Sequence, residues 1–417
     1  MVSRAAVAKK RQGGPVIPGN SGYAARLILE PASCRIMRFP FHLLAVTALL
    51  SAAAPAFAAM PSIDTSARNA LIVDFDTGAL LLDKGADQRI APASMSKMMT
   101  EYVVFDYLKK GRATLDDMLP VSEKAWRTQG SKMFVPLGQK VKLDDLLRGM
   151  IIQSGNDACL VLAEGLAGSE AAFVEQMNAT AKALGLTGSH FVNVDGLPDP
   201  DEYMTARDLA TLARHLIADF PEYYHYDSEK DFTFNGIKQG NRNPLLYADS
   251  TVDGLKTGHT DEAGYCLTAS AVRGGRRVIV VLAGMATMKE RGSESAKLLE
   301  FAYREYNDYK LATAGEVIDQ APVWLGETGQ VTVTVARDVV VTLPRRDRPD
   351  MKVSAVYDGP VHAPVAIGQP VGKLVIAAPD LPQPIAVALV AAQPVGRLGP
   401  FGRMAAAAGY LAFGRRN

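Results

Sequence analysis

Regular spacings of apolar and polar residues divide much of the chain into segments with strand or helix periodicity. NALIVDFDTGALLLDKG, residues 69–85, predicts a hairpin, because two strand-like runs flank the turn residues Asp76, Thr77 and Gly78. Further strands are expected over 263–272 and 277–284. Helical periodicity is expected over 94–110, 143–166, 170–184, 205–220 and 293–309.

The order of these segments indicates a fold class. Strands stand at both ends of the region and helices lie between them, which predicts an α+β domain over residues 59–311. We expect an antiparallel sheet flanked by helices, with a helical insertion.

The character of the chain changes after this domain. QVTVTVARDVVVTLP, MKVSAVYDG and VGKLVIAAP are short β-branched or alternating runs broken by Pro and Gly, so residues 312–393 are expected to form a small all-β domain.

The last segment, 394–417, predicts a helix after Pro400 with apolar residues on one side and arginines as its cations. It is too short to span a membrane, so we expect it to lie on the membrane surface. The alternative is a frayed end, or one packed on a domain.

Residues 1–58 are expected to be an N-terminal extension and an export signal. MRFPFHLLAVTALLSAAAPAFAAMPS has a positive start at Met37 and Arg38, an apolar core and a small-residue end, with cleavage expected after Ala58. We therefore expect a periplasmic protein attached to the outer face of the inner membrane by its tail. Translation could start at Met1 or at Met37.

Composition and charge narrow the classes of function. The 417 residues are 48% apolar and 21% charged, with a formal net charge of +1, which is typical of a globular protein and argues against a nucleic-acid partner. The three cysteines, Cys34, Cys159 and Cys266, show no zinc-binding spacing. Cys159 and Cys266 lie in apolar stretches and are expected to be core residues rather than a bridge. No metal or cofactor is expected.

Ser94 and Lys97 are the first candidates for chemistry. They lie three residues apart on one helix face, so the lysine amine can reach the hydroxyl and take its proton once burial lowers the lysine pKa. The alternative is an N-cap serine beside a solvated lysine. Because Met95, Met98 and Met99 surround the pair, we expect a buried helix and a lysine with a function.

Two further triplets strengthen this hypothesis. Ser154 and Asn156 stand at the start of an apolar helix, 60 residues after Ser94, and Lys256 with Thr257 and Gly258 follows 102 residues later. In the order S-x-x-K, S-x-N, K-T-G these triplets form the motif set of penicillin-binding proteins and serine β-lactamases.

The resemblance extends beyond the three motifs to one family. NRNPLLYADSTVDGLKTGHTDEAGYCLTASA, GLPDPDEYMTARDLATLARHLI and SESAKLLEFAYREY resemble the low-molecular-mass penicillin-binding proteins of the D-alanyl-D-alanine carboxypeptidase type, over residues 62–393. The resemblance implies a peptidoglycan stem pentapeptide as substrate, removal of its terminal D-Ala, and covalent inhibition by β-lactams.

The resemblance also implies roles for residues. Ser94 would form the acyl-enzyme, Lys97 would be the base, and Ser154 would pass a proton to the leaving amine. Asn156 would hold the substrate amide, and the backbone N–H groups of Ser94 and His259 would form the oxyanion hole. Gly258 belongs to the same motif.

The substrate's terminal carboxylate would be bound by Lys256 and Thr257, with Arg242 and Arg291 as candidate helpers. A surface ion pair is the alternative for each arginine. Pro244 and Cys266 depart from the family pattern, which would have Gly and Asn there; both departures concern fine specificity.

Three other functions share parts of this motif set or fold. A β-lactamase of the class with this motif order needs a glutamate in an E-x-x-L-N loop, which the segment between Ser154 and Lys256 lacks. A D,D-endopeptidase and a non-catalytic peptidoglycan- or β-lactam-binding module remain alternatives. A decayed site would be expected to lose Lys97 or Lys256, and both are present.

Overall fold

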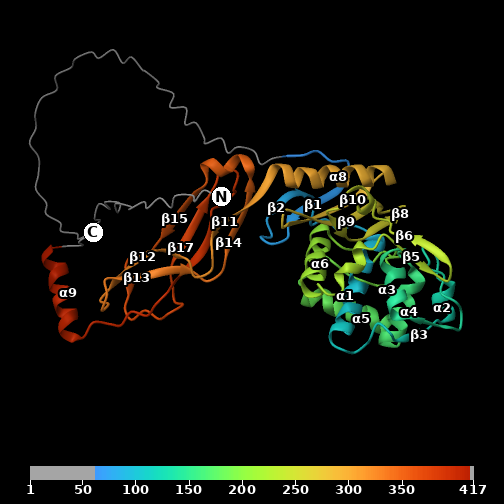
Figure 1. Ribbon diagram of the computed structural model, residues 1–417, viewed down its shortest axis with the longest axis horizontal. Helices are drawn as coiled ribbons and strands as arrows, with labels where there is room; N and C mark the ends of the chain where they lie inside the picture. The colour runs from blue at the N-terminus through green and yellow to red at the C-terminus, as the bar shows by residue number, and fades with distance from the viewer. Residues whose placement is uncertain (1–61, 414–417) are drawn as a thin grey trace, which may run out of the picture.

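The computed structural model describes residues 62–413. Figure 1 shows a mixed domain of sheet and helices, an elongated β domain that follows α8, and the terminal helix α9 beyond the β domain. The predicted export signal and Cys34 lie outside the described residues.

One antiparallel sheet forms the centre of the first domain. Its strand order is β2-β1-β10-β9-β7, and β8 also pairs with β9. The sheet confirms the predicted hairpin and the predicted pairing of strands from the two ends of the domain. The strands are β1 (Asn69–Asp74), β2 (Leu80–Lys84), β7 (Val252–Gly254), β8 (Thr257–Thr260), β9 (Gly264–Arg273) and β10 (Arg276–Met285).

The two faces of this sheet are covered by different helices. On one face Ile72 and Val280, opposite each other in the register, pack in one buried cluster with Leu298 of α8 (Met288–Glu305). The next pair, Leu71 and Val281, points to the other face and joins the larger core with α6 (Ala206–Asp219). Because successive side chains of these buried strands point to opposite faces, the sheet separates two apolar cores.

The helical insertion lies on that second face (Figure 1). Its main helices are α1 (Lys97–Lys109), α2 (Glu123–Arg127), α3 (Leu143–Ile151), α4 (Asn156–Ala167) and α5 (Glu170–Ala183). The shorter elements are η1 (Ala93–Ser96), η2 (Tyr224–Ser228), α7 (Leu245–Ala248), and the strand pairs β3 (Met118–Pro120) with β4 (Lys140–Lys142) and β5 (Asp231–Phe234) with β6 (Ile237–Gly240).

The helical pattern expected over 143–166 forms two helices, and the second begins at the S-x-N motif, as the placement of Ser154 and Asn156 at a helix start predicted. The chain leaves the helix after Ile151 and begins α4 at Asn156, and Ser154 adopts a left-handed backbone conformation (φ 64°). The Gly155 N–H donates to the Gly149 carbonyl across this break (2.8 Å). Apolar periodicity continued through the break because residues on both sides of it are buried.

The helix predicted over 293–309 ends earlier, at Glu305. Tyr306 leaves the helical conformation and begins β11 (Tyr306–Ala312), which pairs with β14 (Val339–Pro344). The antiparallel pairing of residues 306–312 with β14 shows that this segment is a strand. We propose that the β domain begins at Tyr306, six residues before the predicted boundary.

The β domain confirms the predicted all-β character of this region. A six-stranded sheet in the order β15-β17-β18-β13-β12-β16 packs with the β11-β14 pair around one apolar core. Its other elements are β12 (Val317–Trp324), β13 (Gln330–Val335), η3 (Arg345–Asp350), β15 (Lys352–Val356), β16 (Val361–His362), β17 (Pro370–Ala377) and β18 (Ile385–Ala391).

The tail forms the helix that the sequence predicted, α9 (Pro400–Phe413). Phe401, Met404 and Leu411 are 86%, 70% and 86% exposed. Within residues 62–413, no helix has the length and apolar character needed to cross a membrane.

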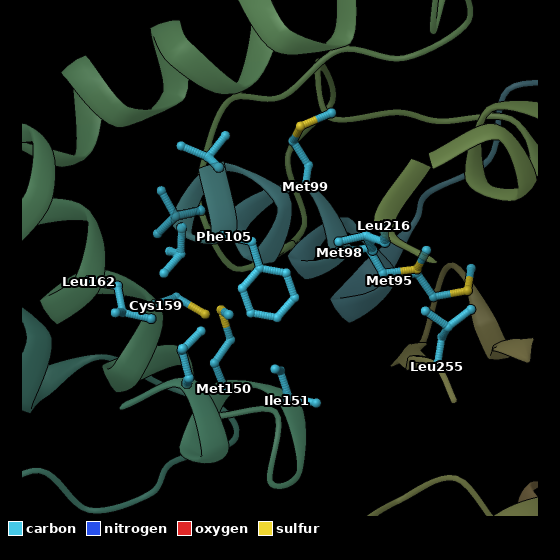
Figure 2. Close-up of a cluster of buried hydrophobic side chains, with 14 of the residues drawn as sticks. Met95, Met98, Met99, Phe105, Met150, Ile151, Cys159, Leu162, Leu216 and Leu255 are labelled. Atoms are coloured by element: carbon cyan, nitrogen blue, oxygen red, sulfur yellow. The ribbon is translucent and has the colours of Figure 1, made fainter. Parts of the chain in front are cut away.

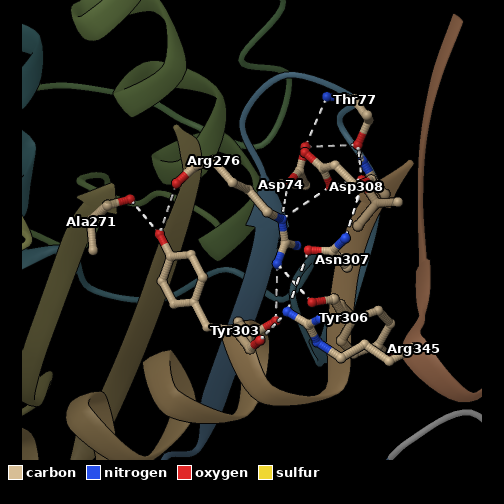
Figure 3. Close-up of polar contacts among 12 residues, drawn as sticks. Asp74, Thr77, Ala271, Arg276, Tyr303, Tyr306, Asn307, Asp308 and Arg345 are labelled. Atoms are coloured by element: carbon tan, nitrogen blue, oxygen red, sulfur yellow. Dashed lines mark hydrogen bonds and ion pairs between the residues drawn. The ribbon is translucent and has the colours of Figure 1, made fainter. Parts of the chain in front are cut away.

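A buried polar cluster joins the two domains (Figure 3). The Arg276 guanidinium contacts the carboxylates of Asp74 (2.9 Å) and Asp308 (3.0 Å), which belong to β1 and β11. The hydroxyl of Thr342 in β14 donates to Asp308 (2.8 Å) and lies 2.5 Å from that of Thr77. Because one guanidinium contacts a carboxylate from each domain, this cluster joins the two domains.

We predict that Arg276→Met lowers the free energy of unfolding by about 3–5 kcal/mol, because it leaves the buried Asp74 carboxylate and the partly buried Asp308 carboxylate without their cation. Urea unfolding measures the change. Arg304→Met is the matched control, since Arg304 pairs with Glu305 at the surface and its removal should change little. Equal stability of the two variants would contradict the argument.

Candidate active site

The first motif lies where a short 3₁₀ turn leads into helix α1. Ser94 lies in η1, and Lys97 is the first residue of α1, with its amine 2.9 Å from the Ser94 hydroxyl. Ala93 before the serine has a positive φ of 48°. The turn therefore presents the hydroxyl and the amine to each other, as the spacing predicted.

Lys97 is 1% exposed, which contradicts the alternative of a solvated lysine. Its amine also donates to the backbone carbonyl of Asp195. Burial lowers the pKa of Lys97 below its ordinary value, and the Arg242 guanidinium lowers this pKa further, against the opposing effects of Cys159 and acidic neighbours. An amine with a lowered pKa is a better proton acceptor near neutral pH.

A second buried lysine interacts with Lys97. Lys256 is 2% exposed, and its pKa lies well below the ordinary value because of burial first and the Lys97 charge second. Because repulsion between two ammonium groups acts on both, the two lysines are disfavoured from being charged together.

The helix that carries Lys97 is packed in apolar side chains, as the three methionines predicted. Met95, Met98 and Met99 are fully buried, and Figure 2 shows them on the helix near Leu216 and Leu255. This packing excludes water from the back of the site.

The K-T-G motif lies against the S-x-x-K turn. A Cβ on Gly258 would stand 2.8 Å from the Pro92 carbonyl oxygen and 3.2 Å from the Ala93 Cβ, so glycine is required for this close approach. The neighbouring His259 imidazole stacks on Tyr265, with 3.9 Å between ring centroids. This geometry agrees with the choice of His259 for its main chain.

The S-x-N motif occupies the break between α3 and α4. Ser154 is 1% exposed, and its hydroxyl has no hydrogen-bond partner among the described residues. The Asn156 side-chain amide donates to the Gln129 carbonyl (2.7 Å). Cys159, one turn further along α4, interacts electrostatically with Lys97 and Lys256, so the three motifs converge on one buried region.

The two candidate arginines are linked to each other. The Arg291 guanidinium donates to the Arg242 carbonyl (3.3 Å), and the Arg242 guanidinium donates to the Ser131 hydroxyl (2.6 Å). Within residues 62–413 neither forms an ion pair with a carboxylate, so the alternative of a surface ion pair is wrong. Arg291 is 5% exposed, and burial lowers its pKa.

Sequence reasoning missed two aspartates that shape the site. Asp195 holds the Lys97 amine through its backbone carbonyl, and a carbonyl contact has no signature in the sequence. The buried Asp157 carboxylate accepts from the backbone N–H groups of Met133 (2.9 Å), Phe134 (2.8 Å) and Val135 (3.1 Å). An aspartate directly after the S-x-N asparagine, at the first turn of an apolar helix, was the available signal.

The two described cysteines are core residues, as the sequence analysis expected. Cys159 and Cys266 are free and buried, and burial raises the pKa of the Cys159 thiol to about 12, so it is not a thiolate nucleophile. Figure 2 shows Cys159 among Met150, Phe105 and Leu162. Among the described residues no group of His, Cys, Asp and Glu side chains is arranged to hold a metal ion.

Comparisons with known proteins agree with this geometry. Residues 54–287 match the family described as D-alanyl-D-alanine carboxypeptidase, and residues 306–397 match the C-terminal domain of penicillin-binding protein 5. D-alanyl-D-alanine carboxypeptidase DacA of Escherichia coli is 42% identical over 323 residues, which cover 76% of this chain and 80% of that protein.

Solved structures lead to the same family. The crystal structure of penicillin-binding protein 5 from Haemophilus influenzae is 40% identical, with a TM-score of 0.74 over 81% of this chain and 99% of that chain. Penicillin-binding protein D2 from Listeria monocytogenes, in its ampicillin-bound form, is 33% identical, with a TM-score of 0.53 over 58% of this chain and 98% of that one. The chain therefore belongs to the D-alanyl-D-alanine carboxypeptidase family of serine peptidases.

Proposed function

We propose that this chain removes the terminal D-Ala from peptidoglycan stem pentapeptides through an acyl-enzyme on Ser94. The observation that carries the proposal is the contact between the Ser94 hydroxyl and the buried Lys97 amine (2.9 Å). Burial lowers the pKa of Lys97 and so increases the neutral fraction that can accept a proton. A serine hydroxyl needs such a base to become a nucleophile.

Acylation follows from this contact. Ser94 attacks the carbonyl carbon of the penultimate D-Ala while its proton passes to Lys97. The backbone N–H groups of Ser94 and His259 stabilise the oxyanion of the tetrahedral intermediate. The intermediate collapses when the C–N bond breaks, and the proton held by Lys97 passes through the Ser154 hydroxyl to the leaving D-Ala amine, which leaves Lys97 neutral again. The buried Ser154 hydroxyl has no hydrogen-bond partner among the described residues, so it is available for this transfer.

In deacylation, water is the nucleophile and the Ser94 oxygen is the leaving group. A water molecule gives a proton to the neutral Lys97, attacks the ester carbonyl, and releases the shortened tetrapeptide when the proton returns to the Ser94 oxygen. Asn156 holds the substrate amide during both steps, and its link to Gln129 (2.7 Å) fixes its side chain.

The terminal carboxylate of the substrate is the best candidate partner for the cations near the K-T-G strand. Lys256 and Thr257 bind it directly, with Arg242 and Arg291 behind them. Two guanidiniums without carboxylate partners among residues 62–413 support this assignment, because unpaired cations attract a free carboxylate.

A β-lactam resembles this substrate, because it also presents a reactive amide beside a carboxylate. We therefore expect penicillins to acylate Ser94 as well. The ampicillin-bound form of the Listeria monocytogenes relative supports this expectation.

The tail supports attachment to the outer face of the inner membrane in the periplasm. Phe401, Met404 and Leu411 are exposed along α9, and Arg403 adds a positive charge. An apolar helix side with basic residues suits a membrane surface with anionic headgroups.

We predict that the chain from Ala59 releases D-Ala from a D-Ala-D-Ala pentapeptide and gains one ampicilloyl adduct, on Ser94. Lys97→Met should slow acylation by about a hundredfold to ten-thousandfold, because the hydroxyl loses its base. Peptide mass spectrometry locates the adduct, and stopped-flow acylation gives the rate. Lys109→Met, at an exposed position of the same helix, is the matched control.

An adduct on another residue, or none, would overturn the assignment of Ser94 and favour a binding module. Full activity of Lys97→Met would show that a different base operates.

We further predict that deletion of residues 400–417 moves the protein from the membrane fraction to the soluble fraction without loss of turnover. The double variant Phe401→Ser/Leu411→Ser keeps the length of the tail and should have the same effect, because it removes exposed apolar contact area. Ala407→Ser serves as control. Unchanged fractionation of both variants would contradict membrane attachment through α9.

A further inference from the structure

One loop, residues 129–135, forms hydrogen bonds with two groups of the proposed site. The Gln129 carbonyl accepts from the Asn156 side chain (2.7 Å), and the Ser131 hydroxyl accepts from the Arg242 guanidinium (2.6 Å). The Ser131 carbonyl also accepts from the Asn156 backbone N–H (2.7 Å). The loop therefore contacts a residue assigned to the substrate amide and a residue assigned to the substrate carboxylate.

The loop lies close enough to the S-x-N motif that glycine is required on both sides of the contact. Gly130 has a φ of 80°, and a Cβ there would stand 2.8 Å from the Asn156 side-chain nitrogen. A Cβ on Gly155 would stand 2.8 Å from Oδ1 of Asp157 and 3.1 Å from the Met133 backbone nitrogen. The middle residue of the motif therefore has to be glycine for the loop to approach.

The Asp157 carboxylate is the acceptor that holds this loop. Its Oδ1 accepts from the backbone N–H groups of Met133 (2.9 Å) and Ala158 (3.0 Å). Its Oδ2 accepts from those of Phe134 (2.8 Å) and Val135 (3.1 Å). Asp157 is 0% exposed, so these four donors take the place of water. Hydrogen bonds to an ionised acceptor are stronger than those between neutral groups.

The backbone of the loop is shaped around this carboxylate. Phe134 has a positive φ of 68°, which is unfavourable for a bulky residue. Its side chain is 54% exposed, so side-chain packing does not account for the conformation. A left-handed residue in such a run turns successive N–H groups toward one anion. The bonds to Asp157 therefore explain why the strained conformation persists.

The other side of the loop is held by strand β6. The Gln239 side chain, which is 4% exposed, donates to the Met133 carbonyl (3.1 Å). Arg242 follows two residues after β6 ends at Gly240. A loop released from Asp157 would therefore disturb the Arg242 segment as well as the S-x-N motif.

We propose that Asp157 is a positioning residue, which holds loop 129–135 in the conformation that substrate binding requires. In that conformation the loop orients the Asn156 side-chain amide and the Arg242 guanidinium through the contacts described above. All four hydrogen bonds of the Asp157 carboxylate among the described residues come from backbone N–H groups, so it acts through the loop. The inference rests on the proposed function of the site.

Asp157→Asn tests the proposal with little change in side-chain size. The new NH2 group replaces one oxygen and faces two N–H donors, so two bonds to the backbone are lost. The KM for a D-Ala-D-Ala peptide should rise by about fivefold to thirtyfold. Because the oriented groups bind substrate and transition state alike, kcat should change by less than about threefold. Steady-state release of D-Ala gives both constants.

Asp208→Asn is the matched control. Asp208 is also buried, and its carboxylate accepts from the Gly188 backbone N–H (2.8 Å) and the Ser189 hydroxyl (2.7 Å), which belong to a different loop. This variant should lower the thermal midpoint and leave KM at the wild-type value. A wild-type KM in Asp157→Asn would overturn the proposal. So would KM increases that follow the loss of stability in both variants.

Non-additivity shows whether Asp157 acts through the loop contacts. The double variant Asn156→Ala/Ser131→Ala removes both side chains through which the loop acts. Adding Asp157→Asn to it should lower the second-order rate constant of ampicillin acylation by less than about threefold, although the same change in the wild-type chain has its full effect. An equal effect in both backgrounds would mean that Asp157 acts by another route, which contradicts the proposal.

Ser131→Ala gives a test that does not alter Asp157 and its hydrogen bonds. The thermal midpoint should stay unchanged, and KM should rise by about threefold to tenfold because Arg242 loses its partner. A wild-type KM would overturn the proposed link between the loop and this arginine. Release of D-Ala and ampicillin labelling of Ser94 are first measured in the wild-type chain, so failure of the proposed function is recognised separately.

Discussion

The site depends on the burial of one amine. An ammonium group without water and without a carboxylate in contact is costly, so burial drives Lys97 toward its neutral form. The same burial places the amine against the Ser94 hydroxyl and the Asp195 carbonyl. Desolvation therefore supplies both the basicity and the fixed position that a general base requires, and the surrounding fold has to maintain that desolvation.

Two backbone features maintain the desolvation of the Lys97 amine. Gly258 lets the K-T-G strand approach the Pro92 carbonyl more closely than any side chain would permit. The left-handed conformation at Ser154 ends one helix and turns the chain into the next, so that a hydroxyl and an amide reach the site from the same break. A continuous helix through 143–166 would have placed these groups on different faces, since they are two residues apart.

Much of this arrangement could be predicted from the sequence, because motif order and spacing identify residue types that the chemistry requires. The hairpin, the antiparallel pairing and the tail helix were also predictable from periodicity. Apolar spacing alone does not reveal the break at 152–155, since it reports burial and continues across a bend between two buried helices; the S-x-N motif marks the start of the second helix. The role of Asp195 was not predictable because its contact with Lys97 uses the backbone carbonyl, which leaves no signature in the sequence.

Buried charges have opposite effects in the two parts of the molecule. At the domain junction Arg276 lies within 3.0 Å of two carboxylates, so attraction offsets desolvation and the charges hold the fold together. Near Ser94, Lys97 and Lys256 are buried and form no ion pair with a carboxylate of residues 62–413, so desolvation is only partly offset and the pKa values of both lysines are lowered instead. Distance between opposite charges therefore decides whether a buried group stabilises the structure or remains available for proton transfer. Any change that brought a carboxylate into contact with Lys97 would strengthen the fold and weaken the base.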